Sequence, residues 1–98
     1  MQKVKIQEYE EAVSQLIPLA LTDSLAGRAA AQVLLGTFNG FKFKLDITDL
    51  CFLDRRNFDL AIAVIRGRVE LGLEPHAVVD EGRENFYKIW DMWEKGGD

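Results

Sequence analysis

The stretch NGFKFKLDITDLCFLD, residues 39–54, separates two apolar helical patterns and decides how they pack. Its first two residues, Asn39-Gly40, are typical of a helix end, because glycine adopts the left-handed conformation at little cost. Over 41–45 apolar residues alternate with lysines, which is a strand period. Since no second run of this kind is present, we expect an extended connector whose apolar side chains enter a helical core: Phe41, Phe43 and Leu45. Strand pairing across a dimer is the alternative.

The aspartates of this stretch are explained as helix starts. Asp46 followed three residues later by Asp49 approximates a capping box, and Asp54 precedes the best helical pattern of the chain. The other interpretation is a metal-binding or enzymatic module that joins Asp46, Asp49 and Asp54 with His76, because carboxylates one helical turn apart can hold a divalent cation. The calcium-loop spacing D-x-D-x-D-G is absent. We therefore expect structural caps and no bound metal.

Two helices are expected before this stretch. Apolar residues recur at three- and four-residue steps over 4–21, and Pro18 should kink this helix or end it just before. Asp23 or Ser24 can cap a second helix, since either side chain accepts from free amides of a first turn. This second helix should run to Phe38.

After the stretch, the helix that follows Asp54 is apolar on two sides, with Phe58 and Val69 on one of them. A helix of this kind is usually central, so we expect it to be the hub of the fold. A short helix should begin at Pro75 and close at Gly82. The last helix should cover 83–95 and leave 96–98 as a frayed tail.

Length and composition are those of one soluble domain. The chain has 98 residues, 48% of them hydrophobic and 29% charged. With the helical periodicity, this predicts an all-α fold, a compact single-domain bundle of four to five helices over residues 1–98. Its longest apolar runs have six residues, whereas a membrane-spanning helix needs about 20. The only cysteine, Cys51, has apolar neighbours, so we expect a buried thiol and a cytoplasmic protein.

The charge argues against nucleic-acid binding. Twelve Lys and Arg face sixteen Asp and Glu, for a net charge of −4, whereas nucleic-acid binding usually needs a basic surplus on one surface. The one local basic concentration lies among acidic residues: Arg55, Arg56, Arg66 and Arg68. We interpret it as a solvated helix face, with DNA binding as the alternative.

Motifs that carry chemistry are missing from the sequence. The phosphate-binding patterns G-x-G-x-x-G and G-x-x-x-x-G-K-[ST] are absent, as are G-x-S-x-G and C-x-x-C. No recognisable motif places a base beside either serine. We expect a protein that is not an enzyme and has no cofactor.

The C-terminal segment ENFYKIWDMW, residues 84–93, concentrates aromatic side chains. We expect its Phe86, Ile89, Trp90 and Trp93 stripe to close the core. The alternative is an exposed interaction surface, because Trp, Tyr and Met are enriched at the centres of protein interfaces. The residues of this possible surface are Tyr87, Trp90, Met92 and Trp93.

A longer pattern includes the opening stretch. It begins at Asp23-Ser24, continues through an Arg…Ala-Gln-x-Leu-Leu helix and Phe38-Asn39-Gly40, and ends in D-I-T-D-L-x-x-L-D at 46–54. Here the sequence resembles a family of small uncharacterised proteins encoded mostly in phages, prophages and plasmids. The resemblance covers about a third of the chain. It implies a bacterial or phage-infected cytosolic setting and brings no catalytic residue with it.

These observations favour a non-enzymatic helical accessory protein of a mobile genetic element that acts through protein–protein contacts. Its partner would be another protein or a second copy of the chain. One alternative is an inhibitor of a host defence nuclease whose acidic surface occupies a nucleic-acid groove. The other is the small metal-binding or enzymatic module at Asp46, Asp49 and Asp54.

Overall fold

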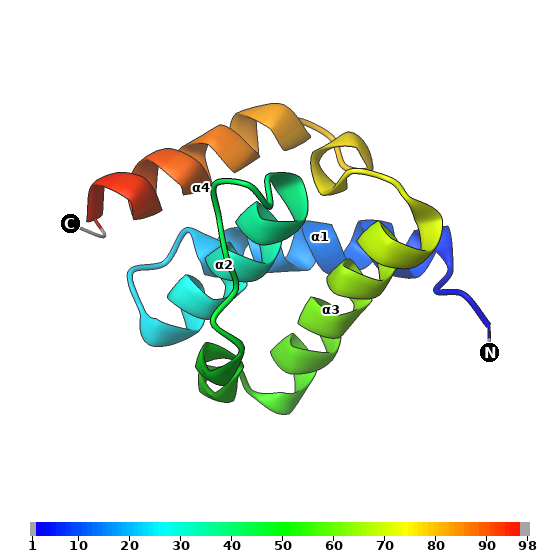
Figure 1. Cartoon of the computed structure of the whole chain (residues 1–98), viewed down its shortest axis with the longest axis horizontal. Helices are drawn as coiled ribbons and strands as arrows, with labels where there is room; N and C mark the ends of the chain where they lie inside the picture. The colour runs from blue at the N-terminus through cyan, green and yellow to red at the C-terminus, as the bar shows by residue number, and fades with distance from the viewer. Residues whose placement is uncertain (1, 97–98) are drawn as a thin grey trace.

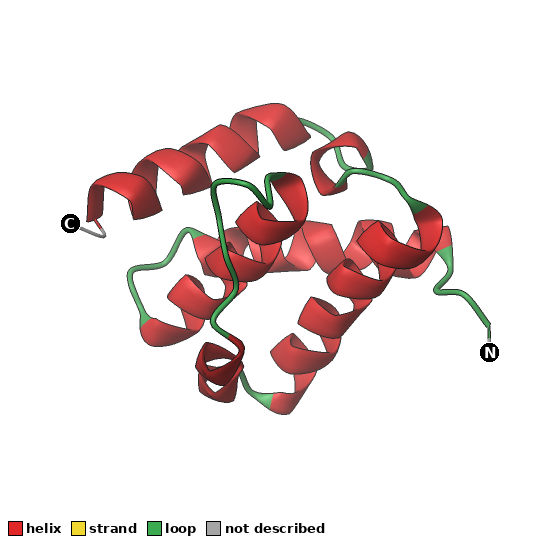
Figure 2. Ribbon diagram, viewed as in Figure 1, coloured by secondary structure: helices red, strands yellow, loops and turns green. Residues whose placement is uncertain are grey.

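The computed structural model describes residues 2–96, and the side chains of residues 2–94. It contains four α-helices: α1 (Ile6–Ala20), α2 (Leu25–Phe38), α3 (Arg55–Arg66) and α4 (Gly82–Gly96). Three short helical segments complete it: η1 (Ile47–Phe52), the π-turn η2 (Gly67–Leu71) and η3 (Pro75–Ala77). The described part of the chain has no strand, which confirms the all-α prediction (Figures 1 and 2).

The C-terminal segments differ in length from the prediction. The short helix expected to run from Pro75 to Gly82 is a single 3₁₀ turn, and Gly82 begins α4 instead of closing η3. Helix α4 includes Gly96, which was expected in the tail, and the other residues of that prediction, 97–98, lie outside the described residues. None of the helices in the described range has the length and hydropathy needed to cross a bilayer.

The hub of the fold is α2, not the helix that follows Asp54. Helix α2 contacts α1, α3 and α4 as well as η1 and η3 (Figure 1). Seven of its residues are buried, among them Ala29, Ala30 and Ala31, and small side chains let neighbouring helices approach closely on several sides. Helix α3 buries only Ala61 and Val64. The prediction took two apolar sides as the mark of a central helix, but Phe58 and Val69 on one of these sides are exposed.

The π-turn explains why the predicted stripe of α3 does not stay on one face. Residues beyond Arg66 follow π geometry, whose wider turn changes the side-chain register. Val69 is consequently 77% exposed, although an uninterrupted α-helix would place it below Ile65. The turn also brings Gly67 against the ring of Tyr9 in α1, where an added Cβ would overlap the ring carbons. Gly67 therefore permits a close contact between α1 and η2.

Helix α1 does not end before Pro18. It continues to Ala20, and the backbone of Leu21 donates to Ile17 and Pro18. The proline is tolerated in this last turn, where Pro18 itself is exposed. Ser14, whose carbonyl would receive the missing N–H, is also exposed to water.

Side-chain caps start three of the helical segments. Ser24 accepts from the Gly27 amide, Asp46 from the Thr48 amide and Asp54 from the Asn57 amide, which confirms the predictions for Asp46 and Asp54. Of the two candidates for the N-cap of α2, Ser24 is confirmed, and Asp23 does not cap the helix. Asp49 is also not a cap: it is 7% exposed and turned toward α2.

Residues 39–46 form a connector that crosses α2 (Figure 1). Phe43 and Leu45 pack against the core as expected, but Phe41 is 99% exposed. A turn over 40–42 interrupts the alternation before Phe43, so the pattern does not extend back to Phe41. The connector also leaves α2 without the expected left-handed glycine, since Gly40 does not have a positive φ.

Cys51 was expected to be buried, yet it is exposed. It lies on the 3₁₀ turn η1, in which Asp49 and Leu50 face inward. Its neighbour Leu50 is buried, whereas Phe52 is exposed like Cys51, so apolar neighbours in sequence did not predict burial here.

Candidate functional site

One face of the molecule contains a cleft of about 520 Å³. Its residues come from α2, the connector and the end of α4: Arg28, Ala31, Gln32, Leu35, Phe43, Lys44 and Trp93. The four residues from α2 are spaced by three and four positions, so they form one face of that helix. The volume lies within the range of about 300–1,000 Å³ that ligand pockets usually have.

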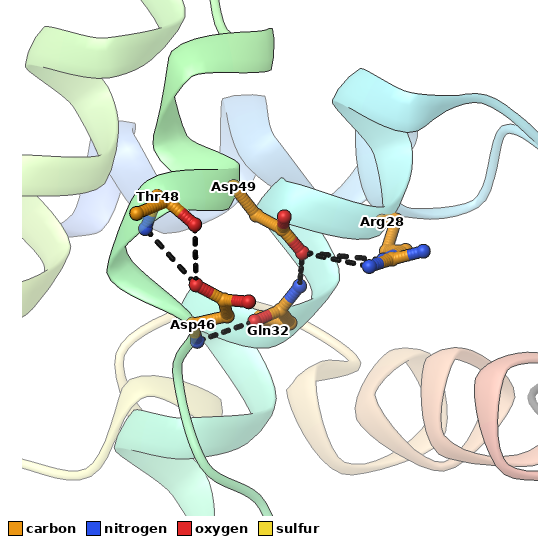
Figure 3. Close-up of polar contacts among 5 residues, drawn as sticks. All are labelled: Arg28, Gln32, Asp46, Thr48 and Asp49. Carbon is orange, nitrogen blue, oxygen red and sulfur yellow. Dashed lines mark hydrogen bonds and ion pairs between the residues drawn. The ribbon is translucent and has the colours of Figure 1, made fainter.

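A polar network fixes one wall of this cleft (Figure 3). The Oδ2 atom of Asp49 accepts from Nε and Nη2 of Arg28, at 3.2 and 3.0 Å, and from Nε2 of Gln32 at 2.7 Å. The Oε1 atom of Gln32 accepts from the backbone N–H of Asp46 at 2.7 Å. Both ends of the Gln32 amide are thus used to join α2 to the start of η1.

Asp46 stabilises the same corner from the connector side. Its Oδ1 atom accepts from both the hydroxyl and the backbone N–H of Thr48, at 2.7 and 3.1 Å. These two hydrogen bonds lower the pKa of the Asp46 carboxyl below its usual value. The carboxylate therefore stays ionised at neutral pH and holds the first turn of η1.

Aromatic contacts fix the opposite wall. The indole N–H of Trp93 donates to the carbonyl oxygen of Ala20 at 2.7 Å, which anchors α4 to the end of α1. The ring of Phe43 meets Trp90 edge-on, with centroids 4.9 Å apart. Lys42 lies over the Trp90 ring at 5.7 Å and its Nζ is 3.7 Å from Glu94. The connector is thereby attached to α4 outside the cleft.

A second hollow of about 310 Å³ lies along another part of the connector. It shares Gln32, Phe43 and Lys44 with the cleft and extends toward Leu45 and Ile65. Two hollows therefore lie along the connector where it crosses α2, and Lys44 lines both of them.

The charge of the cleft differs from that of the whole protein. The chain carries −4, but among the described side chains, those that line the cleft include two cations, Arg28 and Lys44, and no carboxylate. Arg28 is half-exposed and uses Nε and Nη2 for Asp49, which leaves Nη1 outside these bonds. Lys44 donates to the backbone oxygen of Gly40 and forms no ion pair with the described carboxylates.

The C-terminal aromatic residues have different environments. Trp90 and Trp93 are half-buried against the core, and Met92 is half-buried. Tyr87 is 52% exposed and stacks on Trp90, with centroids 5.9 Å apart. Of this predicted surface, only Trp93 lines the cleft.

The proposed metal or catalytic grouping does not assemble. Within residues 2–96, no three His, Cys, Asp or Glu side chains are arranged to hold a metal ion. Asp46, Asp49 and Asp54 each have a separate structural role. His76 packs edge-on against Phe38, at 5.0 Å between centroids, with Nδ1 3.5 Å from Glu74.

The four arginines of the basic concentration also have individual partners. Arg55, Arg66 and Arg68 pair with Asp59, Glu70 and Glu74, and Arg56 donates to Gln15. The Glu70 carboxyl has a pKa below its usual value, chiefly because Arg66 donates to it and then because the Val4 amide does. These pairs neutralise most of the positive charge that DNA binding would use.

Sequence reasoning missed most of the cleft, including Arg28, Gln32 and Lys44. One signal was present: Arg28 and Gln32 are the only polar residues with long side chains in α2, and they lie one turn apart. Two such residues on one face of an otherwise apolar helix indicate either a buried polar network or a site. Lys44 and Trp93 could not be recognised in this way, because they reach the cleft only when the connector and α4 pack beside α2.

The comparison with protein families gives a match over nearly the whole chain. Residues 10–94 match a family described as "Family of unknown function (DUF7673)". The chain belongs to this family. Searches among curated proteins and among solved structures returned no match.

Proposed function

We propose that this member of the DUF7673 family is a non-enzymatic accessory protein that binds another protein through the face around the cleft. The observation that carries the proposal is the cleft itself, which has an apolar floor, a cationic rim and walls already fixed by hydrogen bonds. Such a site loses little conformational entropy when it binds, and preorganisation of this kind favours affinity.

Phe41 supports a protein partner. It lies on the connector two residues before Phe43, and 99% of its surface is exposed. Exposing a phenylalanine ring sacrifices about 1.5–3 kcal/mol of burial energy. A partner that covers Phe41 while occupying the cleft would recover this energy, and aromatic residues are frequent anchors in interfaces.

A binding role, as opposed to catalysis, is also supported by the polar side chains near the cleft, which form hydrogen bonds that hold the fold together. Asp46, Asp49 and Gln32 are all engaged in bonds that hold the fold together. The hydroxyl of Ser24 caps α2. An activated nucleophile requires a neighbouring base, and Cys51 and His76 lie on separate segments, η1 and η3.

The biological setting is part of the same proposal. A mobile genetic element as the source, and the cytoplasm of its bacterial host as the location, rest on the sequence pattern between Asp23 and Asp54. The match over residues 10–94 supports the part of the sequence-based prediction that placed the chain in an uncharacterised family.

The test is affinity capture from bacterial lysate with two matched double variants. Phe41→Ser with Lys44→Gln alters the proposed face, whereas Phe52→Ser with Lys42→Gln makes the same chemical changes at other exposed positions. We expect the first variant to lose a captured protein that the wild type and the second variant retain. Equal capture by all three proteins, or none by any, would contradict the proposal. Circular dichroism checks that both variants are folded.

A further inference from the structure

The cleft selects its ligand by charge as well as by shape. Its floor is apolar, formed by Ala31, Leu35, Phe43 and one side of Trp93. A bulky apolar side chain placed there leaves water, and each CH₂ so buried contributes about 0.8 kcal/mol. One part of the ligand is therefore apolar.

The polar groups around the floor offer little to a neutral ligand. The Trp93 indole N–H already donates to Ala20. The Gln32 amide is bonded at both ends, to Asp49 and to the backbone of Asp46. A neutral group that bonded to the Gln32 amide or to the Trp93 N–H would have to displace one of these bonds, which costs free energy.

The remaining donors are cationic. Arg28 keeps Nη1 outside its bonds to Asp49, and Lys44 is paired with none of the carboxylates in residues 2–94. Asp49, the partner of Arg28, is buried and accepts three hydrogen bonds on one oxygen. A cationic ligand group would face two like charges at the rim, whereas an anionic group would gain charge-assisted hydrogen bonds.

We propose that the cleft binds a partner segment in which an Asp or Glu stands next to a large apolar residue. The apolar side chain lies on the floor between Leu35 and Trp93, and the carboxylate meets Lys44 and Arg28 at the rim. This inference rests on the proposed function and specifies the chemistry of the partner. An acidic segment could then bind at this cationic cleft, although the protein as a whole carries −4.

The probe is a set of four acetylated and amidated tetrapeptides, measured by backbone-amide NMR titration of the whole chain. Ala-Phe-Asp-Ala carries both features, and Ala-Phe-Asn-Ala has the same shape without the charge. Ala-Phe-Lys-Ala reverses the charge, and Ala-Ala-Asp-Ala lacks the ring. We expect the Phe-Asp peptide to shift the amides of residues lining the cleft and to bind about tenfold more tightly than the Phe-Asn peptide.

The protein variants use neighbouring lysines of the connector. Lys44→Gln should reduce the preference for Phe-Asp over Phe-Asn to about twofold or less, because it removes the unpaired cation. Lys42→Gln makes the same change of net charge outside the cleft and should keep the preference. Raising the salt concentration should weaken the Phe-Asp peptide and leave the Phe-Asn peptide nearly unchanged.

Three results would overturn the inference: equal binding of the Asp and Asn peptides, preference for the Lys peptide, or shifts outside the cleft. If cleft-dependent capture from lysate persists in that case, the proposed function stands and only the ligand chemistry is wrong. If the Phe-Asp peptide binds as expected but no captured protein depends on the cleft, the proposed function fails and the inference about the site holds.

Discussion

Two aromatic residues tie α1 to other parts of the molecule, and they do so with opposite results. The Tyr9 hydroxyl donates to the Leu73 carbonyl at 2.7 Å, and the Trp93 indole donates to the Ala20 carbonyl at 2.7 Å. The Tyr9 ring is fully buried and lies against Gly67 without spare room. Trp93 is half-buried and borders a cleft of about 520 Å³. The same kind of anchor thus closes a core in one place and holds a cavity open in the other.

The difference follows from what lies opposite each ring. A glycine on the π-turn lets the backbone reach Tyr9, so no space remains. Opposite Trp93, α2 presents Ala31 between longer side chains that are held back by the polar network with Asp49. Close packing is the rule for protein interiors, and a preformed hollow is the exception associated with binding.

The largest effect is expected for Gly67→Ala, which tests how closely Tyr9 packs against η2. The backbone of Gly67 is α-helical, so alanine has no conformational penalty, but its Cβ would overlap the Tyr9 ring. We expect a loss of about 3 kcal/mol in the free energy of unfolding, measured by urea denaturation. A loss below about 1 kcal/mol would mean that the contact between α1 and η2 is looser than described.

The buried phenol gives a pH-dependent test of the same contact. Burial, the largest effect, raises the pKa of Tyr9 from 10.0 to about 12, while nearby Arg68 lowers it and Glu74 raises it. Well below pH 10 the phenol is protonated in both the folded and the unfolded chain. Between these two pKa values the unfolded chain loses the proton first, so the free energy of unfolding should fall by about 2–3 kcal/mol as pH rises.

The control for this titration is Tyr9→Phe, which cannot ionise at this position. It should lose about 1 kcal/mol at neutral pH, because the hydrogen bond to Leu73 is gone. Its stability should then decline less steeply than that of the wild type in the alkaline range. Parallel curves would show that Tyr9 ionises as easily in the folded chain as in the unfolded one.

A smaller effect is expected at the start of α3, the helix that leads into Gly67. Asp54→Ala removes the bond from the Asn57 amide and should cost about 1 kcal/mol in thermal or urea unfolding. Asp23→Ala is the matched control, because Ser24 caps α2 instead, and it should stay within about 0.5 kcal/mol of the wild type. Equal losses at both positions would contradict the assignment of the caps.

The smallest expected change has the opposite sign and lies on the open side of the molecule. Gly36 borders the second hollow in α2, and an added Cβ would meet only the Phe43 carbonyl oxygen, at 3.8 Å. Gly36→Ala should therefore stabilise the protein by about 0.5–1 kcal/mol through helix propensity. With Gly67→Ala, the same substitution would then have opposite effects on the packed and the open side. Destabilisation at Gly36 would show that the space is not available.

The sequence was sufficient for features that depend on near neighbours. Helical periodicity located all four α-helices, and the caps Asp46 and Asp54 follow from side chains that bond two or three residues ahead. Sequence-based prediction failed where short helical segments have a period other than that of an α-helix. It also failed for contacts between segments that are distant in the sequence. On the 3₁₀ turn η1, Cys51 was expected to be buried and is exposed, and Asp49 was expected to be a cap and is buried.

The contacts that define the two sides of the molecule had no local signal. Nothing near Gly67 in the sequence indicates that Tyr9 would lie on it, because the two are 58 positions apart and the π-turn cannot be recognised from composition. The cleft combines α2, the connector and α4, and its charge becomes apparent only when Arg28, Lys44 and Trp93 are placed together.

Both tryptophans of the chain, Trp90 and Trp93, lie on α4. One ring meets the connector at Phe43 and the other is bonded to the end of α1. Intrinsic fluorescence is therefore a local signal in this protein, which records the attachment of α4 and not the melting of α2 and α3. Its agreement or disagreement with far-ultraviolet circular dichroism distinguishes a single cooperative unit from one whose last helix detaches first.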